Sequence, residues 1–174
     1  MTKTLGYVFS MLLSSAQVHA EDAFQGVQCG PDIAKTLKGQ RVSDEAAAAI
    51  ERRHAALGLK NLGGSEISDH LFVASWLICG KELALLVDDR SIVRDILPFP
   101  AHDNNSPGFT GACTVDGKTV PETVIAVLRN EAGTGPLPAT AAWKIDEKGA
   151  RFTGIKADGL RCPRDGIFTS DGGR

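Results

Sequence analysis

The chain has 174 residues, a formal net charge of −2 and 43% hydrophobic residues. This length suits one domain that can bury a sizeable core. A mildly acidic chain without a basic block gives no electrostatic reason to bind nucleic acid or anionic lipid, so we predict no nucleic-acid partner.

Residues 1–20 have the pattern of a secretory signal peptide. Lys3 provides a positive start, and a short apolar run follows it. Small residues precede the expected cleavage site, with Val18 at position −3 and Ala20 at position −1. The apolar run has about half of the ~20 residues that a membrane-spanning helix needs. We expect cleavage after Ala20, a periplasmic or secreted protein of a bacterium, and no membrane insertion.

All four cysteines follow this signal: Cys29, Cys79, Cys113 and Cys162. An even number of cysteines in an exported chain predicts two disulfides, and three pairings are open. We favour Cys29 with Cys79 and Cys113 with Cys162. Each bond then closes a loop of about 50 residues and contributes roughly 4 kcal/mol in the chain-entropy model. Because no C-x-x-C motif is present, we expect neither a metal site nor a cofactor.

Two helices are expected first along the mature chain. Pro31 suits the first turn of a helix, and Gly39 is a natural end for it. Ser43 can cap a second helix that Gly58 closes.

From His70 onward, apolar runs and turn residues predict strands. Residues 90–97 fit either a helix or a strand. A hairpin is expected around Asp116-Gly117. The strand segments are residues 70–79, 82–87, 112–121, 122–129, 139–145, 150–155 and 160–162.

The fold class that follows is α+β, with the two N-terminal helices packed on an antiparallel meander of about six strands. The alternative is an all-β barrel or sandwich with a helical N-terminal extension. We expect a single domain over residues 21–162 and a flexible polar tail over residues 163–174.

No assembled catalytic pattern is present. A nucleophile elbow, Gly-x-Ser-x-Gly, does not occur, and the histidines are far apart in the sequence. Asp88-Asp89 is the one candidate pair of acids, and we interpret it as a solvated turn. We therefore predict no catalytic and no metal-binding residues, and we lean against an enzyme.

Two long loops, residues 98–111 and 130–138, are the remaining candidates for function. The first contains four candidate binding residues: Phe99, His102, Asp103 and Phe109. An apolar ring displayed by a loop is a plausible contact for a partner protein. The alternative places both phenylalanine rings under the loop, in the core.

We therefore predict an exported, disulfide-braced, non-catalytic domain that binds a partner protein or a ligand in the bacterial envelope. In design it resembles the small inhibitor or immunity proteins of that compartment. Two alternatives stay open. One is a small envelope hydrolase with a dispersed acid, histidine or serine, and the other is a structural or adhesion domain. The sequence predicts neither the partner nor the oligomeric state.

Overall fold

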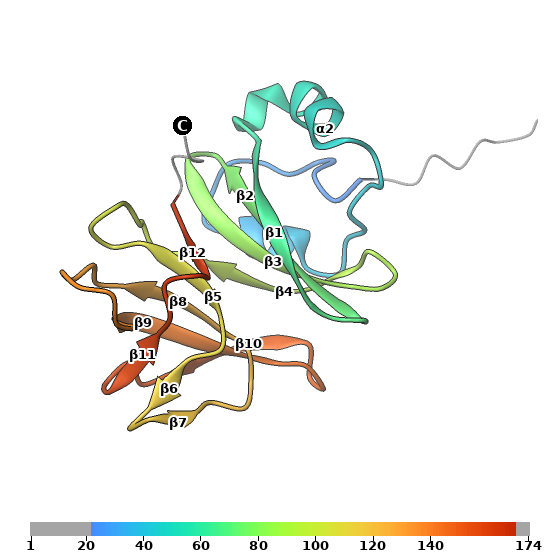
Figure 1. The fold of residues 1–174 in the computed structure, drawn as a ribbon. Coiled ribbons are helices and arrows are strands. Elements are labelled where there is room, and N and C mark those ends of the chain that lie inside the picture. The colour runs from blue at the N-terminus through green and yellow to red at the C-terminus, as the bar shows by residue number, and fades with distance from the viewer. Residues whose placement is uncertain (1–21, 170–174) are drawn as a thin grey trace, which may run out of the picture.

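The computed structural model describes residues 22–169, which form two antiparallel sheets preceded by a short helical segment (Figure 1). The expected signal peptide, residues 1–20, lies outside the described residues. Residues 170–174 lie outside them as well.

The helical segment is shorter than the sequence pattern predicts. It contains α1 (Ile33–Leu37), α2 (Ala47–Arg53) and a 3-10 turn, η1 (Ala55–Leu57). Ile33 and Leu37, one turn apart, are the buried residues of α1. The expected cap residue Ser43 instead closes a turn, because its Oγ accepts the Glu45 N–H at 3.2 Å and the helix begins four residues later.

The first sheet has four strands in chain order: β1 (Lys60–Ser68), β2 (Leu71–Ile78), β3 (Lys81–Asp88) and β4 (Val93–Pro98). Ile78 pairs with Lys81, so Cys79 and Gly80 form the two-residue turn between β2 and β3. Both have positive φ, 54° and 75°, as a type I′ hairpin requires. The sequence predicts this turn one residue later, at Gly80-Lys81.

The second sheet has eight strands in the order β12-β5-β8-β9-β11-β6-β7, and β10 pairs with β9. The expected hairpin at Asp116-Gly117 is present between β6 and β7. The strands are β5 (Gly108–Gly111), β6 (Thr114–Val115), β7 (Lys118–Thr119), β8 (Val124–Leu128), β9 (Leu137–Asp146), β10 (Arg151–Ile155), β11 (Leu160–Cys162) and β12 (Ile167–Phe168). Within the expected tail, Ile167 and Phe168 form β12 and pair with β5 of the second sheet.

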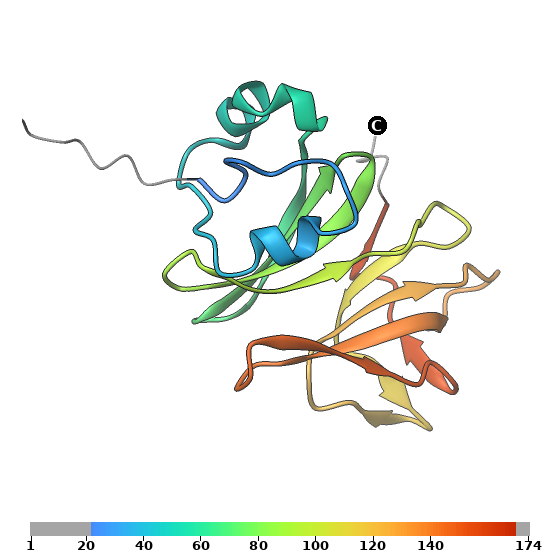
Figure 2. The same ribbon diagram turned by 180° about the vertical axis from the view of Figure 1, so that it is seen from behind.

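The core has three parts, which follow from the alternation of side chains along the strands. One face of the first sheet packs on the helical segment, around Leu37, Ile50 and Trp76. Its other face packs on the second sheet, where Val73 and Leu86 are buried with residues of β8 and β9. Figure 2 shows the helical segment over the first sheet. The third part is formed by residues of the second sheet itself, among them Phe109, Leu128 and Leu160.

The predicted fold class, two helices on one six-stranded sheet, is wrong. Among residues 22–169, strands make up 45% and helices 10%, and the strands form two sheets. One cause is β1, which the sequence pattern misses because its residues KNLGGSEIS contain two adjacent glycines and no regular alternation. A second cause is the loop between β4 and β5, which leads the chain out of the first sheet into the second.

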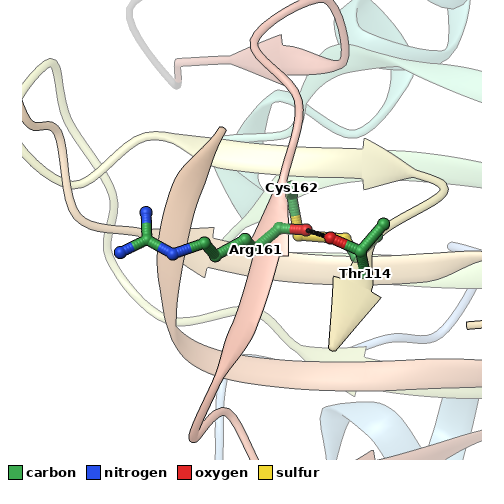
Figure 3. The surroundings of a disulfide bond; sticks show 4 residues. Thr114, Arg161 and Cys162 are labelled. Carbon is green, nitrogen blue, oxygen red and sulfur yellow. Dashed lines mark hydrogen bonds between the residues drawn. A yellow bond between two sulfur atoms is a disulfide. The ribbon is translucent and has the colours of Figure 1, made fainter. Parts of the chain in front are cut away.

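Two disulfides join distant parts of the chain, and both follow the pairing favoured from the sequence. Cys29–Cys79 attaches the N-terminal segment to the β2–β3 turn, and Cys113–Cys162 attaches the segment before β6 to β11. Beside the second bond, Thr114 Oγ1 donates a hydrogen bond to the Arg161 carbonyl at 3.4 Å (Figure 3). The Arg161 side chain points away from the disulfide (Figure 3).

Candidate functional site

Phe99 and Phe109 are both buried, which agrees with the alternative that places their rings in the core and not with display to a partner. Phe109 on β5 is 0% exposed and belongs to the core of the second sheet, and Phe99 is 6% exposed between the two sheets. Asp103 closes its own loop, because its Oδ1 accepts the N–H groups of Asn105 and Ser106, both at 2.8 Å. Of the four candidate binding residues, the structure therefore brings only Phe99 and His102 to one place.

The two long loops lie against each other. The backbone N–H of Asn130 donates to the Asn105 carbonyl at 2.8 Å, and its side-chain amide donates to the Asn104 carbonyl at 2.9 Å. Arg164 then holds the second loop from the other side by donating to the carbonyls of Gly135 and Glu131. These hydrogen bonds hold the two loops in fixed positions relative to each other.

Phe99 and His102 meet an acidic residue that the sequence analysis does not single out, Glu82 on β3. His102 Nδ1 lies 3.5 Å from Glu82 Oε2, and the two side chains are 1% and 8% exposed. The same His102 atom lies 3.3 Å from the Pro100 carbonyl. The loop is fixed beside β3 because the Phe99 N–H donates to the Glu82 carbonyl at 2.9 Å. A carboxyl and an imidazole are thus held together at the edge of the core between the sheets.

Aromatic rings surround the imidazole. The His102 ring lies edge-on to Phe99 and to Phe168, each with centroids 5.2 Å apart, and Phe99 and Phe168 stack at 5.9 Å. Phe168 comes from β12, and Trp143 from β9 lies 6.2 Å from Phe99. The His102 ring therefore packs against its own loop and β12, and Trp143 supports Phe99 from β9.

The acid, the imidazole and Phe99 line a cavity of about 390 Å³, which we name the Glu82–His102 pocket. Its size falls in the range typical of small-molecule sites, which combine apolar walls with a few polar groups. The residues that line it are Leu77, Gly80, Lys81, Glu82, Pro98, Phe99, Ala101 and His102.

The environment of the pocket changes the chemistry of Glu82. Burial raises the pKa of this carboxyl, and the nearby His102 opposes the rise only in part. Glu82 therefore holds its proton to a higher pH than an ordinary glutamate. A carboxyl with a shifted pKa beside an imidazole in a cavity is typical of functional sites.

One signal in the sequence could have found Glu82. Along β3 it occupies the same face as Ala84 and Leu86, which are buried between the sheets. A charged residue in register with core positions needs a partner or a function, because burying an unpaired charge is costly. His102, in contrast, can be recognised only after folding, because it lies 20 residues away in a loop.

The acid pair considered from the sequence, Asp88 and Asp89, lies at the β3–β4 turn and lines a second cavity of about 260 Å³. Asp88 Oδ1 accepts the N–H groups of Arg90 and Ile92, so this acid closes the β3–β4 turn. Asp89 and His70 are both exposed and lie 3.5 Å apart. Among residues 22–169, no group of three or more histidine, cysteine or acidic side chains could hold a metal ion.

Comparison of the chain with protein-family models, curated proteins and solved structures finds no match. Within the described part of the chain, no helix has the length and apolar character needed to cross a membrane. The two disulfides fit a secreted or periplasmic protein. Function is therefore inferred from the geometry of the described residues.

Proposed function

We propose that this protein is an exported, non-catalytic binding domain that holds a small, partly apolar ligand in the Glu82–His102 pocket. The observation that carries the proposal is a carboxyl and an imidazole, both more than nine-tenths buried, that line one cavity. Leu77, Pro98 and Phe99 supply apolar surface around this pair. Such a combination gives affinity through the walls and orientation through the polar groups.

The cost of burying Glu82 supports a functional role. A buried carboxyl with a raised pKa stabilises a fold less than an apolar side chain of similar size would. The position lies on a core-facing register of β3, where an apolar residue would pack without this cost. Polar residues that lower stability in this way are expected at binding sites.

The location of the protein is part of the proposal. We infer that a signal peptide is removed after Ala20 and that the domain works in the bacterial periplasm or outside the cell. The two disulfides support this location, because such bonds persist in oxidising compartments. Sequencing the N-terminus of the native protein tests it: the expected first residue is Glu21, and an intact Met1 contradicts the inference.

A fragment screen by two-dimensional NMR tests the binding function. We expect the amide signals of Gly80, Ala101 and His102 to move when small, partly apolar fragments are added. The variant Ala101→Trp should fill the pocket mouth and abolish binding. Its matched control is Ala132→Trp, because Ala132 is also exposed but belongs to the other long loop; this variant should bind as the wild type does.

The screen also separates this function from the inhibitor-like or immunity-like alternative. If no fragment binds at the pocket, the proposal fails. A protein recovered from envelope extract equally well by Ala101→Trp and by the wild type would then favour a partner surface elsewhere on the domain.

A second candidate function, hydrolysis of a small substrate, has one observation in its favour. Glu82 and His102 are an acid and a base 3.5 Å apart that line the same cavity. The described residues that line the pocket include no serine, threonine or free thiol, so a covalent mechanism through a hydroxyl or a thiol has no nucleophile among them. Turnover of ester or wall-fragment substrates that disappears in His102→Gln would place hydrolysis above binding.

A further inference from the structure

The Glu82 carboxylate has hydrogen-bonding capacity that the described residues do not use. An ionised carboxylate offers about four acceptor sites. Within residues 22–169, the ion pair of Glu82 is the one with His102, at 3.5 Å. Charge-assisted N–H···O hydrogen bonds are typically about 2.7–2.9 Å long, so this contact leaves room for a stronger donor. A donor on a ligand in the cavity can approach the same oxygens.

The walls beside Glu82 are suited to a positive charge on an apolar body. Phe99 lines the same cavity, and aromatic rings attract cations at their faces. Leu77 and Pro98 offer contact surface for carbon atoms. An organic cation would therefore find a carboxylate, an aromatic ring and apolar walls within one site.

From this arrangement we propose that the Glu82–His102 pocket selects a compact organic cation, a primary amine on a small apolar body. This inference rests on the proposed binding function and names its ligand class. Burial of Glu82 supports it, since a desolvated carboxylate gains more from a cationic partner than an exposed one does.

Two other charged or titratable groups face the site and define the competing result. Lys81 lines the mouth and is exposed, so water and salt screen its repulsion of a cation. His102 lies 3.5 Å from Glu82 and competes with the ligand for the same carboxyl group. If these two groups dominated, the pocket would select an anion.

Three probes of one shape test the choice: benzylamine, benzyl alcohol and benzoate. Their dissociation constants are measured at pH 7.5 from the NMR shifts of the pocket amides. In the wild type we expect benzylamine to bind at least about tenfold more tightly than benzyl alcohol, a difference of roughly 1.4 kcal/mol. Glu82→Gln should weaken benzylamine binding by about the same factor and leave benzyl alcohol unchanged. The matched control is Glu122→Gln, an acid outside this pocket that pairs with Lys144, and it should change neither constant.

The outcomes separate this inference from the binding function. Benzyl alcohol and benzylamine binding equally well to the wild type would overturn the choice of a cation and leave the binding function standing. Tightest binding by benzoate would also overturn it and would assign an anion site to His102 and Lys81. Failure of all three probes to bind would contradict both the cation preference and the binding function. The ratio of the benzylamine and benzyl alcohol dissociation constants in the wild type tests the choice of a cation even if Glu82→Gln does not fold.

Discussion

His54 Nε2 lies 2.6 Å from Asp22 Oδ2, and this contact fixes the start of the described chain on the end of α2. Asp22 also accepts the Phe24 N–H at 2.7 Å and a hydrogen bond from Arg53 at 3.1 Å. The acid is buried, and Phe24 beside it packs against Trp76 with ring centroids 5.0 Å apart. An acid two residues after the expected cleavage site thus anchors the N-terminal segment to the core.

Loss of this anchor should lower stability in a pH-dependent way. Burial alone would raise the pKa of Asp22, but hydrogen bonds from His54, Phe24 and Arg53 outweigh burial and hold the pKa below its ordinary value. Its contribution is therefore present above the ordinary pKa and lost as the pH falls through the folded value. We expect Asp22→Asn to lower the free energy of unfolding by about 2 kcal/mol at pH 7.

Urea unfolding at pH 7 and at about pH 2 measures this effect. The difference between Asp22→Asn and the wild type should shrink at the lower pH. Asp32→Asn, a change at an exposed acid, is the matched control and should cost little at either pH. An equal loss for Asp22→Asn at both values would contradict the role given to its charge.

Glu82→Gln should raise the free energy of unfolding, whereas Asp22→Asn should lower it. Burial raises the pKa of Glu82, so its contribution to stability is present at low pH and is lost as the pH rises through the folded pKa. At pH 8 the variant, which carries no charge to bury, is expected to be about 1 kcal/mol more stable than the wild type. This advantage should decrease toward pH 4. Thermal unfolding across this range checks it, with the exposed Glu147→Gln as control; a variant less stable than the wild type at pH 8 would contradict the prediction.

Gly64 in β1 should not tolerate a side chain. A Cβ added there would lie 2.3 Å from the Val73 carbonyl oxygen and 2.4 Å from the Phe72 ring. Because the first of these is backbone, the strand must shift, and we expect Gly64→Ala to cost roughly 1–3 kcal/mol. Gly30 has nothing within 4 Å of the same added atom, so Gly30→Ala should be close to neutral. Equal denaturation midpoints for the two variants would mean that β1 does not pair as described.

The two disulfides should differ in their rates of reduction. Cys113 and Cys162 are both fully buried, whereas Cys29 is exposed. Since reduction requires access of a thiolate to sulfur, Cys29–Cys79 should open first under mild reductant. Alkylation at intervals, followed by mass spectrometry of the peptides, measures the order. Simultaneous opening of both bonds would indicate that global unfolding precedes reduction.

Local patterns predicted the parts of the fold that depend on neighbouring residues. β2, β3 and β8 follow from apolar runs, and the Asp116-Gly117 hairpin follows from turn chemistry. The fold class failed because it depends on distant contacts. Sequence periodicity alone does not show that β12 returns to β5, or that the chain divides its strands between two sheets.

The candidate site shows the same limit. The sequence singles out His102 and Phe99 as candidate binding residues of one loop, but it does not show that both are buried after folding. The sequence pattern places Glu82 in a predicted strand and gives it no functional role. Glu82 can be recognised as a candidate site residue only in the folded protein, where the loop after β4 places His102 Nδ1 3.5 Å from its Oε2.

The most direct test of the binding function is a crystal structure of the protein soaked with the tightest fragment from the NMR screen. We expect electron density for the fragment between Glu82, Phe99 and His102, with a polar atom of the fragment within hydrogen-bonding distance of the Glu82 carboxylate. Density for the fragment at another surface, with the Glu82–His102 pocket filled only by water, would contradict it.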